Sequence, residues 1–214
     1  MGQETMKIYD WHIAPNPRRL HIFLAEKGIA VELVEVGQDD LTLAPWFKQK
    51  YPHAMVPMLE LDDGTHIGEA MAIARYFEET NPEPPMMGTD AKDKAIVEMW
   101  EKRANEEGML PASELFRNTH PQFAERGLPG AADAITAIPE LQNRGRARLA
   151  RFFAKFDQQL ADNIFVAGAR VTIADATTLA AVDFAGWSDV KIPSECQNLQ
   201  RWHDMMNQRP SSKA

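Results

Sequence analysis

A proline-rich break at Asn81-Pro82-Glu83-Pro84-Pro85 divides this chain of 214 residues into two stretches of different character. Proline fixes φ and has no N–H donor, so neither a helix interior nor a central strand can run through such a segment. Segments with strand character occur only before the break, whereas apolar residues at helical spacing recur after it. We therefore predict an α/β domain at residues 1–81, a linker at 82–90 and an all-α domain at 91–214.

The stretch before the break alternates strands and helices. A β-prone run at 7–11 precedes a helical pattern from Arg18 to Lys27 that Gly28 ends, and residues 31–36 then alternate as a half-buried strand does. These segments form a βαβ unit, which implies a parallel pair of strands. A loose helix at 42–51, a β-hairpin over 56–67 and a helix over 69–79 complete the predicted order β-α-β-α-β-β-α.

The stretch after the break predicts helices at 91–117, 140–161, 173–186 and 198–208. Residues 118–139 contain several prolines and glycines and are longer than an ordinary connection, as functional loops often are. The helix at 173–186 follows Thr172-Ile173-Ala174-Asp175, which has the pattern of a capping box. We expect that motif to serve folding rather than chemistry.

Composition excludes several classes of function. The chain has 23 basic and 31 acidic residues, a net charge of −8, and its basic residues are scattered, so nucleic acid is not an expected partner. The single cysteine, Cys196, allows no internal disulfide, CxxC pair or cysteine-based zinc site, and the histidines lack metal-ligand spacing. Because no apolar run could span a bilayer and the start MGQETMK is polar, we expect a cytoplasmic protein without a membrane partner.

Three local patterns, taken with the domain order, carry a resemblance to a known family. They are Val56-Pro57 at the start of the third strand, Gly68-Glu69-Ala70 at the start of the third helix, and the capping box at 172–175. The chain resembles the cytosolic glutathione transferase superfamily, in which a thioredoxin-like α/β domain precedes an all-α domain. The segments 9–30, 99–103 and 116–121 look most like bacterial relatives of the atypical fungal transferases.

The resemblance implies a glutathione site in the first domain. The residues implied are Lys50, His53, Val56, Pro57, Glu69 and Ala70. In the family, the bond before the proline is cis and the residue preceding it pairs through its backbone with the cysteinyl part of glutathione. The start of the third helix receives the γ-glutamyl end, since a helix N-terminus offers free N–H groups. Lys50 and His53 are then candidates for the glycine carboxylate, although Lys50 is equally well explained as a solvated lysine.

A conjugating enzyme must hold the glutathione thiol as a thiolate, because the thiolate is the nucleophile. Where related enzymes carry a catalytic serine this chain has Ala14, so another donor is needed. Asn16 is one candidate, and its alternative role is that of an N-cap before Pro17. The atypical relatives use a water held by serine and histidine, which implies Ser113 and His120 as the other candidates.

His12 stands approximately where other relatives carry a tyrosine, and it either contacts sulfur or faces solvent. The absence of cysteine from this loop argues against the thiol-disulfide chemistry of omega-like relatives.

The leading hypothesis is an enzyme of detoxification that conjugates glutathione to small hydrophobic electrophiles, with helices 91–117 and 198–208 shaping the co-substrate pocket. A second hypothesis is a binding or scaffold protein without catalysis, suggested by Ala14 and Ala70. A third is a glutathione-dependent peroxidase or isomerase. The resemblance also implies a two-fold homodimer in which the first domain of one copy contacts the second domain of its partner.

Overall fold

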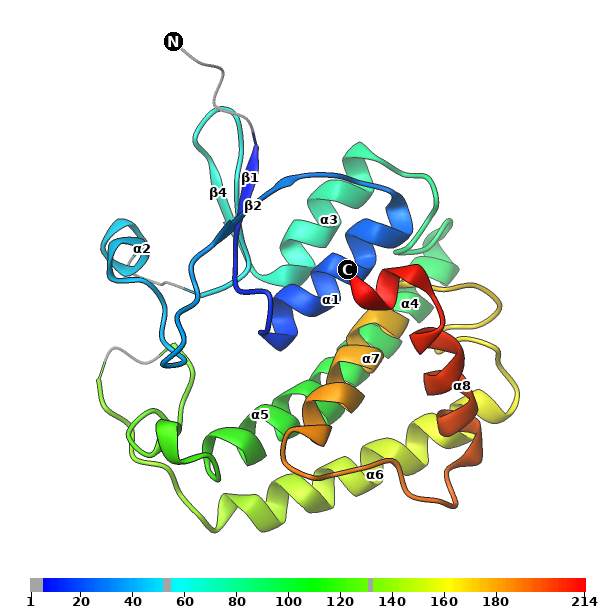
Figure 1. The fold of residues 1–214 in the computed structure, drawn as a ribbon. Coiled ribbons are helices and arrows are strands. Elements are labelled where there is room, and N and C mark those ends of the chain that lie inside the picture. Colours follow the sequence, from blue (N-terminus) through cyan, green and yellow to red (C-terminus); the bar gives the residue numbers. More distant parts are fainter. Residues whose placement is uncertain (1–5, 52–54, 131–132) are drawn as a thin grey trace.

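The computed structural model describes residues 6–51, 55–130 and 133–214. The first part of the chain forms a mixed sheet of four strands in the order β2-β1-β3-β4, and the second part is helical (Figure 1). The strands are β1 (Lys7–Asp10), β2 (Glu32–Glu35), β3 (Met58–Glu60) and β4 (His66–Gly68). β1 and β2 are parallel, as the βαβ pattern predicted, and β3 runs antiparallel to both of its neighbours.

Helices cover the two faces of the sheet. α1 (Pro15–Lys27) and α3 (Ala70–Thr80) lie side by side on one face, and the short α2 (Pro45–Lys50) lies on the other (Figure 1). Because side chains alternate along a strand, Ile8 joins the core shared with α1 and α3, while its neighbour Tyr9 packs with Phe47 of α2. The predicted alternation of strands and helices is therefore confirmed.

The expectation of a half-buried second strand is wrong. β2 is an edge strand, and the side chain of Leu33 in its middle is 49% exposed. Within this stretch only Val36, which follows the strand, is buried. Alternation along the sequence predicted the strand correctly, but its place at the edge of the sheet leaves it little to pack against.

The helical part comprises α4 (Ala91–Arg103), α5 (Leu110–Arg117), α6 (Leu141–Ala161), α7 (Ile173–Gly186) and α8 (Gln197–Asn207), with short η2 (Pro121–Phe123) and η3 (Pro210–Lys213). α7 is buried along nearly its whole length and packs against α1, α4 and α5. A helix surrounded in this way needs apolar or small residues on every side, which the sequence of α7 provides. None of the helices in the described ranges is long and apolar enough to cross a membrane.

The predicted helix at 91–117 is continuous but changes its winding. A π-helical segment, η1 (Ala104–Met109), joins α4 to α5, and the N–H of Leu110 donates to the carbonyl of Asn105. Pro111 follows and has no N–H to continue the ordinary α-helical pattern. Gly108 allows close packing here, because a Cβ at that position would lie 2.8 Å from the Phe152 ring and 2.9 Å from Ala181. Single π turns are frequent near functional sites.

The capping box at the start of α7 is confirmed. The Asp175 carboxylate accepts hydrogen bonds from the backbone N–H of Thr172 at 2.9 Å, that of Val166 at 2.8 Å and the indole N–H of Trp202 at 2.9 Å. Burial raises the pKa of Asp175 to about 6, against the opposing effect of these donors. The motif therefore ties α7 to α8 and to the segment before it.

Candidate functional site

Three predicted site segments converge at one edge of the sheet. Tyr9, near the end of β1, pairs with Met58 at the start of β3, and Met58 also pairs with Gly68 at the end of β4. The loop that leads from β1 into α1 therefore lies at the same edge as Val56-Pro57 and Glu69. The strand register brings these segments together although they are far apart in the sequence.

The start of α1 differs from the expected capping arrangement. Ala14 is the N-cap, Pro15 is the first helical residue and Asn16 the second, so the interpretation of Asn16 as an N-cap before Pro17 is wrong. The local reason is that Pro15 already has the φ angle of a first helical residue. Since neither proline has an N–H, Asn16 supplies the backbone donor of the first three helical positions, and its side-chain amide adds a second donor.

His12, in the loop before α1, is exposed and paired with Glu35 at the end of β2. Its Nδ1 lies 3.0 Å from Oε2 of Glu35, and its backbone N–H donates to the same oxygen at 3.2 Å. These hydrogen bonds outweigh the opposing effect of partial burial and lower the pKa of Glu35. The pair holds the loop against β2.

The peptide bond between Val56 and Pro57 is cis, as the resemblance implied. Pro57 is buried immediately before β3, and Val56 packs against the core formed by Tyr9, Phe47 and Met58. His53 lies outside the described residues.

Glu69 has a backbone conformation that is rare for a residue with a side chain. Its φ is 65° and its ψ is 119°, and it serves as the N-cap of α3 without a capping hydrogen bond from its side chain. Its carboxylate is exposed, whereas the methyl group of Ala70 is buried in the main core. Non-glycine residues held at positive φ cluster at ligand sites, so this geometry supports a binding role for Glu69.

Lys50 belongs to a polar network that the sequence did not reveal. Its Nζ donates to Oε2 of Glu60 at 3.2 Å and to the hydroxyl of Tyr9 at 3.1 Å. Tyr51 and His66 also reach this carboxylate oxygen, at 2.7 and 3.2 Å. Hydrogen bonds to the Tyr51 and Tyr9 hydroxyls raise the pKa of Lys50. The ammonium group therefore already has partners, and its contact with glutathione stays a prediction.

The two candidates from the helical part lie on either side of the end of α5. Ser113 is half-buried on α5, and His120 is the N-cap of η2, where its Nδ1 accepts from the backbone N–H of Gln122 at 3.4 Å. The His120 ring lies 5.0 Å from that of Phe116. No direct hydrogen bond between Ser113 and His120 occurs in the described structure, so their joint action on a water stays a prediction.

A cavity of about 320 Å³ opens beside the start of α1. Its lining comes from the loop and first turn of α1, with His12, Ile13, Pro15 and Arg18, and from α7 and its end, with Ala180, Asp183, Phe184 and Trp187. Among the described residues, those that line this cavity come from neither of the helices 91–117 and 198–208, which we expected to shape the co-substrate pocket. Phe116, in the first of these segments, packs on the Phe184 and Trp187 rings, with ring centroids 5.6 and 5.5 Å apart.

One end of this cavity is charged. Nη2 of Arg18 donates to Oδ2 of Asp183 at 2.6 Å, and Nη1 donates to the carbonyl of Ser212 at 3.1 Å. Nε2 of His203 lies 2.9 Å from Oδ1 of Asp183. Burial alone would raise the pKa of Asp183, but the hydrogen bonds from His203 and Arg18 lower it. The guanidinium and the carboxylate thus face the cavity as a pair whose charges cancel.

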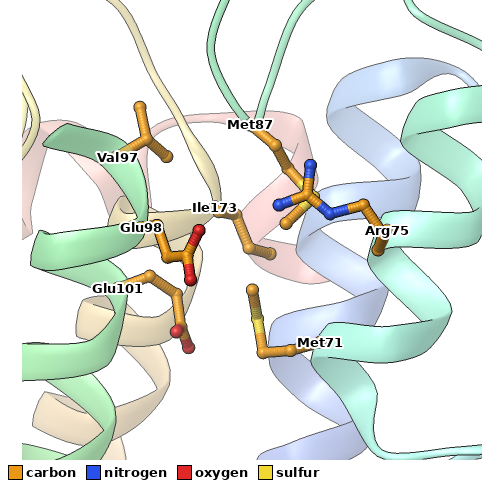
Figure 2. Close-up of a pocket in the computed structure, with 7 residues that line it drawn as sticks. All are labelled: Met71, Arg75, Met87, Val97, Glu98, Glu101 and Ile173. Atoms are coloured by element: carbon orange, nitrogen blue, oxygen red, sulfur yellow. The ribbon is translucent and has the colours of Figure 1, made fainter. Parts of the chain in front are cut away.

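A smaller cavity, of about 140 Å³, lies between α3 and α4. Figure 2 shows Met71 and Arg75 projecting into it from α3, opposite Glu98 and Glu101 of α4. Glu101 also accepts a hydrogen bond from Nη1 of Arg19 at 3.1 Å. This cavity does not include the start of α1.

No group of three or more histidine, cysteine, aspartate or glutamate side chains among the described residues is arranged to hold a metal ion.

Comparison with known proteins agrees with this architecture. Residues 8–85 match the family model of the glutathione S-transferase N-terminal domain, and residues 123–210 match that of the C-terminal domain. Glutathione S-transferase 2 of Saccharomyces cerevisiae is 34% identical over an alignment covering 99% of this chain and 91% of the yeast protein. The chain belongs to the glutathione S-transferase family. Glutathione is the co-substrate of this family.

Solved structures place this transferase near one subgroup. The crystal structure of Gtt2 from Saccharomyces cerevisiae has a TM-score of 0.86 and 32% identity, covering 97% of this chain and 98% of that one. A glutathione S-transferase domain-containing protein from Marinobacter aquaeolei VT8 has a TM-score of 0.83 and 34% identity, covering 96% and 99%. The resemblance to atypical fungal transferases and their bacterial relatives is thereby confirmed.

Sequence reasoning missed the contribution of α7 to the site of this transferase. Asp183 and Phe184 lie within an apolar helix that reads as core, and Trp187 directly follows it. Arg18 reads as an ordinary polar residue at the start of a helix. The one available signal was the exposed-type residue Asp183 within that apolar helix. A carboxylate in such a helix indicated that it pairs with a polar or basic side chain, but not which residue supplies that side chain.

Proposed function

We propose that the chain conjugates glutathione to small hydrophobic electrophiles. One observation carries this proposal. The cavity of about 320 Å³, whose lining includes the Phe184 and Trp187 rings, adjoins the start of α1, at the sheet edge where the predicted glutathione-binding segments converge. Pro15 lines the cavity, and Asn16 is the next residue. A thiolate held at the start of α1 would therefore face an electrophile in the cavity.

The glutathione contacts that we propose are those that the family resemblance implies. The backbone of Val56 would pair with the cysteinyl part, and the exposed Glu69 carboxylate would bind the γ-glutamyl ammonium group beside the free N–H groups of α3. Lys50 and His53 remain the candidates for the glycine carboxylate. In this assignment residues 1–81 hold glutathione, and residues of both parts of the chain line the electrophile site.

The carboxylate of Glu69 provides the first test. Charge-assisted hydrogen bonds contribute about 1.5–3 kcal/mol, so Glu69→Gln should weaken glutathione binding at least about tenfold in titration calorimetry. Glu79→Gln is a matched control, because Glu79 is an exposed residue at the other end of the same helix. Equal affinities of the two variants would contradict the assignment of Glu69.

A second candidate function is binding without catalysis, and the specific observation behind it is Ala14. The N-cap of α1, where related enzymes have a hydroxyl, carries only a methyl group. An assay with a generic aryl halide separates the two functions. Retention on immobilised glutathione with turnover supports conjugation, whereas retention without turnover supports the binding protein.

A two-fold homodimer is the assembly that we propose. On the surface shared by α3 and α4, Arg75 and the exposed Glu98 line the smaller cavity (Figure 2). A two-fold axis that places α3 against α4 would bring each Arg75 close to Glu98 of the partner subunit, so the same patch would serve both copies. Analytical ultracentrifugation should show twice the chain mass at micromolar concentration, and a monomer would refute the assembly.

A further inference from the structure

The charged end of the larger cavity is held by residues that lie far apart in the sequence. Asp183 accepts from Arg18 at 2.6 Å and lies 2.9 Å from His203, and the Ser212 carbonyl accepts the second hydrogen bond of Arg18 at 3.1 Å. A guanidinium group fixed at two nitrogens has little freedom to rotate. Because it has five N–H donors and these two bonds occupy two of them, it can still donate to a ligand in the cavity.

The net charge at this end is close to zero. Asp183 compensates the charge of Arg18 and also pairs with His203 at 2.9 Å, and the other ionisable lining residue, His12, is paired with Glu35 at 3.0 Å. An anionic ligand would have to approach the Asp183 carboxylate without an unpaired cation to compensate it, which is costly in a partly buried site. A neutral oxygen acceptor can take an N–H of Arg18 without that cost.

The aromatic part of the lining favours a flat ligand. The Phe184 and Trp187 rings lie 4.9 Å apart at 73°, and Trp187 is 47% exposed. Aromatic rings that pack in offset-stacked or edge-to-face arrangements are stabilised beyond the area that they bury. The volume of about 320 Å³ is roughly twice that of a 150 Å³ cavity known to hold benzene, so a single substituted ring fits.

We propose that Arg18, held by Asp183, selects planar, uncharged electrophiles that carry an oxygen acceptor such as a nitro or carbonyl group. This inference rests on the proposed conjugation and adds its specificity. The Phe184 and Trp187 rings would hold the aromatic ring while Arg18 donates to the oxygen of its substituent. The reacting carbon would then face the start of α1.

Three benzylic chlorides that differ only in the para substituent provide the test: 4-nitrobenzyl chloride, benzyl chloride and 4-(chloromethyl)benzoate. In each reaction the thiolate sulfur forms a C–S bond, chloride leaves with the electron pair of the C–Cl bond, and the thiol proton passes to solvent. Every kcat/KM is divided by the uncatalysed rate with glutathione, which removes the intrinsic reactivity of the chloride.

The wild-type enzyme should prefer the nitro compound over benzyl chloride by about tenfold, the effect of one charge-assisted hydrogen bond. Arg18→Met should reduce this preference to about one, while Arg151→Met, at an exposed position on α6, should leave it unchanged. Asp183→Asn leaves Arg18 without its counter-ion, so kcat/KM for the benzoate should rise about tenfold.

The melting temperature of each variant shows whether its fold is intact, and its affinity for glutathione shows whether the glutathione site is intact. Turnover of all three compounds without a preference for the nitro group would overturn this inference and leave the conjugation standing. Turnover of none would overturn the proposed function. In that case the inference is tested by calorimetry with the unreactive 4-nitrobenzyl alcohol and benzyl alcohol. Equal affinities of the wild-type protein for the two alcohols would contradict it. If Arg18→Met does not fold, the benzoate response of Asp183→Asn decides instead.

Discussion

Asn16 supplies both a backbone N–H and a side-chain amide donor at the start of α1, where Pro15 and Pro17 have no N–H and Ala14 has no side-chain donor. If Asn16 stabilises the thiolate, Asn16→Ala should lower kcat by about 10²-fold, the typical effect of losing one oriented donor. Glutathione affinity should change little, because the interaction is made with the sulfur alone. Steady-state kinetics with an aryl halide, together with calorimetry, measure both quantities.

The other hypothesis, in which Ser113 and His120 hold a water that stabilises the thiolate, predicts a different result. In that case His120→Ala lowers kcat by a similar factor, whereas Asn16→Ala has a small effect. The pH profile separates the two routes, because an imidazole titrates between about pH 5 and 8 and an amide does not. Unchanged turnover in both variants would exclude both assignments.

Asp175 gives the stability of the protein a defined pH dependence. Its pKa is about 6 in the folded chain, above the ordinary value near 3.9, so the folded state favours the protonated form. The contribution is complete below about pH 3.9 and is lost as the pH rises through about 6, with a total near 3 kcal/mol.

Asp175→Asn does not titrate, and it serves as the reference for this prediction. Urea denaturation at several pH values should show the free energy of unfolding of the wild type falling relative to that of the variant between pH 4 and 7. A constant difference across this range would show that the donors around Asp175 offset its burial.

At the scale of elements, the loop between β1 and α1 is positioned by its contact with Gly37. A Cβ on Gly37 would lie 1.9 Å from Cδ1 of Trp11, so an added methyl group must displace the ring. Gly37→Ala should destabilise the protein by about 1–3 kcal/mol and shift the loop that carries His12. The change would appear in thermal unfolding and in the intrinsic tryptophan emission.

Gly186→Ala is the matched control for this change. Gly186 is the last residue of α7, and a Cβ there would meet no atom within 4 Å. Alanine has a higher helix propensity than glycine, so stability should stay the same or rise by up to about 1 kcal/mol. A similar loss of stability in both variants would contradict the role of the Trp11 contact.

At the scale of the whole molecule, Lys27 connects α1 to α3 and to the segment that enters the helical part. Its side chain is fully buried, and Nζ donates to Glu78 at 2.8 Å and to the carbonyl of Pro84 at 2.6 Å. Glu78 also accepts from the backbone N–H of Met87 at 2.8 Å. This connection holds the end of the sheet-containing part to the start of the helical part.

Lys27→Met should cost about 3–5 kcal/mol of stability in chemical denaturation, because it leaves the Glu78 carboxylate buried without its cation. Adding Glu78→Gln removes that unpaired charge and should restore part of the loss. A double variant less stable than Lys27→Met would contradict the charge-pair explanation.

Local patterns in the sequence determined the order of elements. The parallel pair of β1 and β2 followed from the βαβ spacing, and the capping box at Thr172 and Asp175 followed from residues three positions apart. Such features depend on neighbouring residues, so a single sequence carries enough information for them. The resemblance supplied the cis bond before Pro57, and the structure confirmed it.

Only the tertiary structure decided the surroundings of Lys50, the edge position of β2 and the cavity against α7. Arg18 meets Asp183 and Ser212 at separations of 165 and 194 residues. No periodicity or motif links such residues, because their contact depends on how α1 packs against α7 and on where the chain returns after α8. The sequence alone was therefore enough to predict the family and the sheet edge of the site, whereas the residues that line its cavity depended on the packing of distant helices.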